Sequence, residues 1–356
     1  MTKAELMDIG KSLTTIDQEA MECIRRNWDS IAKPIDGLGL YESIICRIGG
    51  IQGTSDPKVE KRSLILFFSD NGIAENGVSQ SDVSVTRKVA IVTAKKESTA
   101  YLMARKANID VVPIDIGMKG AIVSGIENRR ISDGTKSFLC GDAMTIDQTL
   151  KAIDVGYSIV SELKKKDLDL VLLGEMGVAN TTTATAVGCA LLGKDPLQYT
   201  GHGAGLSDEA MRHKAKVIAD GIRFHGFNSS KANDPLEVLS ALGGYDIAAM
   251  VGSILACAVL HVPVILDGIV TYAAALVAAT MFPAVKEVMI ASHRPKEPMG
   301  RLMMESLGLR APIDADLALG EGTGAILLVP QIDVSIELYR KGISFENLGM
   351  ESYRRY

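Results

Sequence analysis

Residues 168–182 of the chain read LDLVLLGEMGVANTT. The apolar run Leu168–Leu173 lacks strict alternation of apolar and polar residues, which is typical of a strand buried on both faces of a sheet. The loop Gly174–Thr182 follows this strand and opens a helix, which Asn180–Thr182 can cap. Free amide groups at a helix N-terminus bind anions, and Gly177 has no side chain to keep a phosphate away. A tight turn with an ordinary helix cap is the alternative interpretation of this loop alone.

Apolar runs of the same kind recur along the chain, at Ser63–Ser69, Asp110–Ile116, Val262–Leu266 and Glu287–Ala291. Helical patterns separate them, such as Thr145–Lys165, which opens with a capping box formed by its first residue and Gln148. Alternating strands and helices predict an α/β fold with a Rossmann-like parallel sheet wrapped by helices. Ligands of such sheets bind beyond the carboxyl ends of the strands, so the residues after each run are expected to carry the chemistry.

We expect a main α/β domain over residues 61–330, carrying the nucleotide site, and a small helical subdomain from residues 1–60 and 331–356. The first segment is predicted to form a helix that opens with a capping box at Thr15-Ile16-Asp17-Gln18 and stops before Pro34. The polar patch Asn228–Pro235 is too short to separate independent domains.

Composition excludes several classes of protein. The 356 residues carry a formal charge of −5 without a concentrated basic stretch, so a nucleic-acid partner is not expected. The most membrane-like segment, Ile247–Leu260, is shorter than the roughly 20 apolar residues of a spanning helix, and is predicted to be a buried helix leading into a strand. Met1–Gly10 has no apolar signal core, so we expect a cytoplasmic protein without membrane contact.

Cysteine and histidine usage points away from a metal. The cysteines lie far apart in apolar or small-residue surroundings and are predicted to be buried thiols: Cys23, Cys46, Cys140, Cys189 and Cys257. The 5 histidines never fall at ligand spacing, so neither a metal nor another cofactor is expected. The 34 glycines and the aromatic content of 5% predict an aliphatic core with backbone open to close approach.

Two more glycine-rich loops are candidates for chemistry. Gly201–Glu209 precedes a helix capped by Ser207, with Lys214 about two turns into it, so that Lys214 and Ser292 are possible phosphate contacts. In Leu319–Ala325, Glu321 lies between glycines, which suits a general base held against a substrate. The alternative interpretation is a turn glutamate that faces solvent.

The segment Val264–Tyr272 is similar to the phosphoribosyl-pyrophosphate motif of common phosphoribosyltransferases. That motif has adjacent acids, whereas here Asp267 is followed by Gly268. A site for pyrophosphate and magnesium is therefore not expected, although a transferase that depends on phosphoribosyl pyrophosphate stays an alternative that chelators would test.

The motifs together, in order from about residue 33 to 330, resemble the nicotinate-nucleotide:dimethylbenzimidazole phosphoribosyltransferase family. They are Lys33-Pro34 with Gly37-Leu38-Gly39, Asp70-Asn71-Gly72 with Gly77-Val78-Ser79, Gly174-Glu175-Met176-Gly177 with Asn180-Thr181-Thr182, Gly243-Gly244 with Ile247–Gly252, Pro263–Gly268, Ser292-His293 and Gly320–Ala325. The resemblance implies transfer of phosphoribose from nicotinate mononucleotide to an aromatic lower-ligand acceptor in cobamide biosynthesis, with release of nicotinate and inversion to the α-ribotide.

The resemblance also assigns roles to residues. Glu321 is the implied catalytic base. The implied phosphate and nucleotide contacts are Gly177, Asn180, Thr181, Gly203, Lys214, Ser292 and Gly320, and the acceptor contacts are Ser81, Glu175 and Leu319. Members of the family are dimers with sites near the interface, and they need no metal.

Departures from the family pattern concern the acceptor. Asn71 stands where the family usually has His, Asp36-Gly37 where it usually has Gly-Ser, and an aromatic residue is often found near Ser81; all three are expected on or near the acceptor side. Benzimidazole, phenol, p-cresol and purine are open as acceptors, because some relatives use phenols and work as paralogous pairs. The chain is expected to act as a homodimer or as a heterodimer with a paralogue, and a non-catalytic subunit of such a pair is the alternative function.

Overall fold

The computed structural model describes residues 1–227 and 232–355. Its strands are β1 (Arg62–Ser69), β2 (Asp110–Gly117), β3 (Glu127–Asn128), β4 (Leu170–Met176), β5 (Val264–Leu266) and β6 (Met289–Ala291). They form one parallel sheet in the order β3-β2-β1-β4-β5-β6, so the order in which the chain adds strands reverses between β1 and β4. This is the doubly wound order in which ligands bind at the point of reversal, and the predicted Rossmann-like α/β fold is confirmed.

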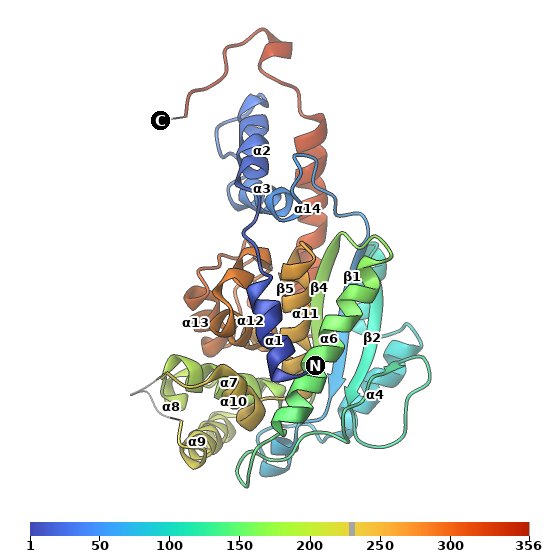
Figure 1. Ribbon diagram of the computed structural model, residues 1–356, viewed down its shortest axis with the longest axis vertical. Coiled ribbons are helices and arrows are strands. Elements are labelled where there is room, and N and C mark those ends of the chain that lie inside the picture. Colours follow the sequence, from blue (N-terminus) through green and yellow to red (C-terminus); the bar gives the residue numbers. More distant parts are fainter. Residues whose placement is uncertain (228–231, 356) are drawn as a thin grey trace.

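Helices cover both faces of the sheet (Figure 1). The α-helices are α1 (Lys3–Lys11), α2 (Gln18–Ser30), α3 (Leu40–Gln52), α4 (Ser84–Ala94), α5 (Thr99–Lys106), α6 (Ile146–Lys164), α7 (Asn180–Leu192), α8 (Pro196–Tyr199), α9 (Asp208–Phe224), α10 (Pro235–Leu242), α11 (Tyr245–Val259), α12 (Ile269–Met281), α13 (Pro298–Ser306) and α14 (Thr323–Lys341). Short 3-10 helices are η1 (Gly72–Asn76), η2 (Pro283–Val288) and η3 (Glu346–Leu348).

The core has two halves because side chains of a strand alternate between the faces of its sheet. In β1, Ile65 and Phe67 pack with α6, α11 and α12, while Leu66 and Phe68 pack on the other face with α3, α5 and α14. Every residue of β1 is buried, as its apolar run Leu64–Phe68 without alternation predicts. Because helices cover both faces of the sheet, a ligand can reach it only at the ends of the strands.

The helical segments at the two chain ends lie in different places. Helices α2, α3 and the C-terminal half of α14 gather at one end of the molecule, whereas α1 packs against α11 of the main body (Figure 1). The division into a main domain and a terminal subdomain stays a prediction, and Tyr356 lies outside the described residues. Of the polar patch Asn228–Pro235, the first four residues also lie outside them, and Pro235 begins α10.

Most predicted elements are confirmed, with corrections at their ends. The capping box of α6 is present, and Ser207 caps α9. The capping box predicted at Thr15 is wrong, because the Asp17 side chain accepts the Ala20 N–H and α2 begins only at Gln18. The strand predicted to start at Glu287 begins at Met289, since η2 occupies the preceding residues.

The loop after β4 is also shorter than predicted. Gly174, Glu175 and Met176 are part of the strand, and the residue that precedes α7 is Ala179 in a left-handed conformation (φ 68°). The predicted side-chain cap from Asn180–Thr182 is wrong, because these residues lie inside α7 and the Asn180 amide bonds carboxylates of the site instead.

The cysteines differ in burial, and the described residues bear on the expectations for membrane spans and metal sites. Cys46, Cys189 and Cys257 are buried as predicted, Cys23 is half-buried, and Cys140 is exposed because it lies in a surface loop before α6. Within residues 1–227 and 232–355, no helix combines the length and apolar character needed to cross a membrane. The same described residues contain no group of three His, Cys, Asp or Glu side chains placed to hold a metal ion.

Candidate active site

A cavity of about 410 Å³ lies at the carboxyl ends of β4, β5 and β6. It is lined by the three predicted glycine-rich loops, which come together from segments far apart in the chain. The predicted site residues on its wall are Ser81, Glu175, Gly177, Asn180, Thr181, Gly203, Lys214, Leu319, Gly320 and Glu321. Ser292 is the predicted site residue that does not line it.

Glu321 is held in an uncommon backbone conformation. Its φ is +57°, and its neighbours Gly320 and Gly322 have φ of +84° and +77°. The loop lies directly on β4, where a Cβ atom added to Gly174 would come within 2.9 Å of the Glu321 carbonyl group. A left-handed residue other than glycine costs free energy and persists only where surrounding contacts hold it, which is common at functional sites.

The Glu321 carboxyl group has the environment of a base. Burial raises its pKa, the Ala100 backbone N–H lowers it, and the charge of Asp267 raises it. The Oε2 atom is buried and has no hydrogen-bond partner among the described residues. An unpartnered carboxylate oxygen can accept a hydrogen bond or a proton, and a raised pKa makes the carboxylate more basic, so the predicted role of a general base is chemically possible here.

Asp267 supports the loop that carries Glu321. Its wholly buried carboxylate accepts the N–H groups of Gly322 at 3.1 Å, Gly324 at 2.7 Å and Ala325 at 3.3 Å. These amides belong to the first turn of α14, where a carboxylate is favoured by the helix dipole. The sequence places Asp267 in the segment Pro263–Gly268 but does not indicate this supporting role, because its partners lie 55 to 58 residues further along the chain.

A second carboxyl group, Glu175, faces the cavity from the end of β4. The Asn180 side-chain amide donates both to Glu175 Oε2 and, at 3.1 Å, to Asp246 Oδ2 at the start of α11. Burial, followed by the charge of Asp246, raises the pKa of Glu175 well above its usual range, and burial raises the pKa of Asp246 to about 6. Asp246 was missed by sequence reasoning because it opens a segment that otherwise has the pattern of a core helix.

The cavity wall also carries a cation. Lys214 is fully buried, and its Nζ donates to Thr181 Oγ1 at 2.9 Å. Burial lowers its pKa, and the nearby charge of Glu297 raises it. Gly203 lies beside both, since an added Cβ would be 3.1 Å from the threonine oxygen and 3.2 Å from the lysine nitrogen. Three residues predicted to contact phosphate are therefore neighbours.

Other predicted positions lie off the cavity wall. Ser292 is buried and its hydroxyl donates to the Leu266 carbonyl at 2.6 Å, so its phosphate contact stays a prediction. Of the three departures from the family pattern, Ser81 alone lines the cavity. Asn71 is buried behind it, donating to the Val178 carbonyl at 3.3 Å, and Asp36 forms an ion pair with Arg355. Asn71 is therefore near the cavity, because Val178 is part of its wall, and the expectation that the three positions lie on or near the acceptor side stays a prediction.

The doubly wound sheet, with a cavity at its strand ends lined by carboxyl groups and a buried lysine, is the architecture of a nucleotide-binding α/β protein. Comparison with known proteins identifies its family. A family model described as "Phosphoribosyltransferase" matches residues 13–350. Proteins named nicotinate-nucleotide–dimethylbenzimidazole phosphoribosyltransferase from Acetivibrio thermocellus and Clostridium acetobutylicum are each 37% identical, over 97% of both chains. A crystal structure of the enzyme of that name from Thermus thermophilus superimposes with a TM-score of 0.87 at 30% identity, covering 94% of this chain and 99% of that chain.

The chain therefore belongs to the nicotinate-nucleotide–dimethylbenzimidazole phosphoribosyltransferase family. It is a phosphoribosyltransferase, as the resemblance of its motifs implied.

Proposed function

We propose that the chain transfers the phosphoribosyl group of nicotinate mononucleotide to an aromatic acceptor, giving an α-ribotide and nicotinate for cobamide biosynthesis. The observation that carries the proposal is that one cavity is lined both by a half-buried carboxylate, Glu321, whose Oε2 is buried without a partner among the described residues, and by a buried lysine, Lys214. The names of the similar enzymes support this donor and this kind of acceptor. The intact Glu321 loop disfavours the alternative of a non-catalytic partner subunit.

The donor binds through its phosphate at one end of the cavity. Lys214 supplies the charge, Thr181 is held against it, and the glycine loops at Gly177 and Gly203 leave room for the phosphate oxygens. Fixing the phosphate orients the ribose, which lowers the entropic cost of bringing its C1′ to the acceptor. Asn180 and Gly320 belong to the same nucleotide-binding wall.

The transfer itself needs one base. The acceptor nitrogen or oxygen attacks C1′ while the bond from C1′ to the nicotinate nitrogen breaks, and the bonding electrons neutralise the pyridinium ring. Glu321 takes the proton that the acceptor loses. Attack from the face opposite nicotinate inverts C1′, so the β-nucleotide gives an α-ribotide.

The acceptor end is formed by Ser81, Glu175 and Leu319. Burial and the charge of Asp246 raise the pKa of Glu175 well above its usual range, which favours the protonated form that can donate a hydrogen bond to the acceptor. Leu319, 56% exposed, offers apolar surface to a flat ring. These features are compatible with each of the acceptors benzimidazole, phenol, p-cresol and purine. An acceptor panel is therefore needed to identify the one that is used.

The test is nicotinate release, measured by chromatography, when the purified chain is incubated with nicotinate mononucleotide and each acceptor in turn. We expect release with at least one acceptor and an α-linked product by NMR, unchanged by a metal chelator. Absence of release with every acceptor, both for the chain alone and for the chain mixed with a paralogue, would refute the proposal.

Assembly and location complete the proposal. We infer a dimer, of two copies or of this chain with a paralogue, acting in the cytoplasm on small molecules. Exposed apolar side chains on α14, Leu327 and Val334, support a protein partner on that helix.

A further inference from the structure

Glu297 is a buried carboxylate at the phosphate end of the cavity to which no role has been given so far. It is 9% exposed and lines the cavity together with Gly203 and Lys214. It precedes α13, yet its side chain makes no capping bond to that helix. Instead Oε1 accepts the Gly203 N–H at 2.9 Å, from a loop 94 residues earlier in the chain.

The surroundings fit a carboxylate at this place. A Cβ atom added to Gly201 would lie 2.3 Å from Glu297 Oε2, so the glycine loop approaches the carboxylate as closely as a glycine allows. Oε2 is buried and has no hydrogen-bond partner among the described residues. The Glu297 charge also raises the pKa of Lys214 against the effect of burial, so the two groups interact.

Glu297 therefore bonds Gly203 and acts by its charge on Lys214, two residues that the proposed function gives to the donor phosphate. A phosphate monoester carries about −1.5 to −2 charge at neutral pH. Two anions beside one buried ammonium repel each other strongly, because the surrounding dielectric constant is low. Binding of the phosphate must then overcome this repulsion and replace the carboxylate at the Gly203 N–H.

We propose that Glu297 competes with the nucleotide phosphate for Gly203 and Lys214 and so sets the affinity of the site for phosphate. The inference rests on the proposed function. The reaction leaves the 5′-phosphate unchanged, so donor and ribotide product share this contact, and a carboxylate that weakens it speeds release of both. Product release limits turnover in many enzymes, which gives such weakening a kinetic value.

The test compares wild type with Glu297→Gln in the full chain. Glutamine has the same shape and still accepts the Gly203 N–H, so the variant removes charge and keeps the loop contact. Calorimetry is carried out with nicotinate mononucleotide and with nicotinate riboside, the matched ligand without phosphate. Glu305→Gln, an exposed position on the helix α13 that follows Glu297, is the control.

We expect E297Q to bind the mononucleotide about tenfold more tightly than wild type, with riboside affinity unchanged. We also expect KM and kcat to fall together, because product leaves more slowly, and inorganic phosphate to raise the melting temperature of E297Q more than that of wild type. The E305Q variant should match wild type in each measurement.

Equal or weaker mononucleotide binding by E297Q would overturn the inference. If E297Q bound both the nucleotide and the riboside more weakly, the inference would also be overturned, because Glu297 would then accept a hydrogen bond from a ribose hydroxyl. A wild-type chain that binds no mononucleotide contradicts the proposed function and the inference together, whereas normal wild-type binding with an unaltered E297Q contradicts the inference alone.

Discussion

Glu321 concentrates the proposed chemistry in one side chain. Its backbone is left-handed, and its buried Oε2 has no hydrogen-bond partner among the described residues. This oxygen is therefore free to accept a proton at the wall of the cavity. We expect Glu321→Gln to lower kcat by about 10²- to 10⁴-fold, because the amide cannot take a proton. Calorimetry should show mononucleotide affinity within about twofold of wild type, since the variant leaves the groups assigned to the phosphate, Lys214, Thr181 and Gly203, in place. A variant that keeps most of its turnover would exclude Glu321 as the base.

The raised pKa of Glu321 predicts the pH profile of that activity. Burial stabilises the protonated form, so the carboxylate becomes a competent base only at a pH above the usual range of a glutamate. The rate should therefore rise with pH through the raised pKa and level off above it, with the acidic limb shifted upward from about 4.5. The measurement is kcat against pH with saturating substrates. An acidic limb below this value would contradict the assignment.

Asp246 links pH to stability. Burial raises its pKa to about 6 in the folded chain, so the folded state holds a proton that the unfolded state releases at lower pH. This contribution to stability is complete below the usual carboxyl pKa and is lost as pH rises through about 6. Relative to wild type, Asp246→Asn should therefore gain about 2–3 kcal/mol of unfolding free energy between about pH 4 and 7. Urea titration tests this, with the exposed Asp147→Asn as control.

At the scale of elements, the site depends on a contact between β5 and α14. Asp267 follows β5 and accepts N–H groups from the first turn of α14, which fixes the loop before it. The conformation of the Glu321 loop is thus stabilised by hydrogen bonds to Asp267, a residue outside the loop.

We expect Asp267→Asn to cost about 1–3 kcal/mol of stability, because the amide replaces an accepting oxygen with a donor that faces backbone N–H groups. If Asp267 acts only by positioning Glu321, the Asp267→Asn variant should have a lower kcat and an unchanged affinity for the mononucleotide. Turnover and calorimetry check this split. Loss of mononucleotide binding in a folded variant would show a direct role instead.

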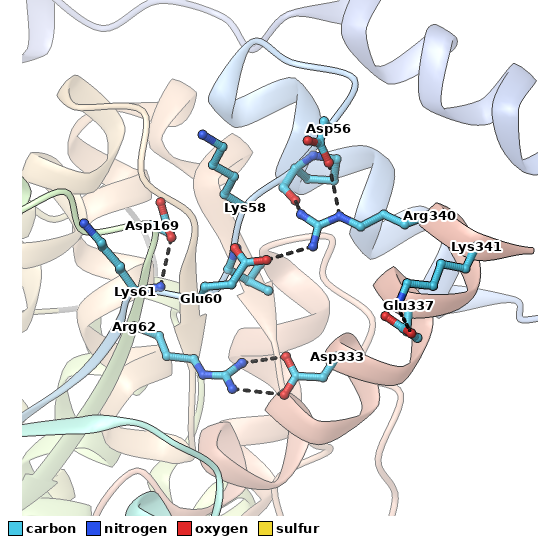
Figure 2. A network of polar contacts seen from close by, with 12 residues as sticks. Asp56, Lys58, Glu60, Lys61, Arg62, Asp169, Asp333, Glu337, Arg340 and Lys341 are labelled. Atoms are coloured by element: carbon cyan, nitrogen blue, oxygen red, sulfur yellow. Dashed lines mark hydrogen bonds and ion pairs between the residues drawn. The ribbon is translucent and has the colours of Figure 1, made fainter.

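At the scale of the whole molecule, α14 connects the site to the opposite end of the sheet. It begins beside Glu321, and its later turns bind the segment that leads into β1 (Figure 2). Arg62 makes a two-bond ion pair with Asp333 at 2.6 and 3.0 Å, and Arg340 bonds Asp56 and Glu60. The terminal helices are thus tied to the sheet by charge as well as by the shared core.

The ion pairs along α14 differ in burial, and burial determines how much each contributes to the free energy of unfolding. The Arg62 side chain is 8% exposed, so Asp333→Ala leaves a buried charge unpaired and should cost about 2 kcal/mol of unfolding free energy. Glu337→Ala breaks the exposed pair with Lys341 on the same helix and should cost less than about 0.5 kcal/mol. Denaturant titration of the two variants measures the difference. Equal costs would mean that Arg62 finds water or another partner.

The parallel sheet, the glycine loops at the strand ends and the candidates Glu321 and Lys214 could all be predicted from the sequence. These features are local, because buried strands, helix caps and glycine turns depend on residues close together in the chain. The contacts of Asp267, Asp246 and Glu297 emerged only from the tertiary structure, since their partners are 55, 66 and 94 residues away. Folding also decided that Asn180 bonds carboxylates and does not cap a helix, because burial leaves its amide no better acceptors.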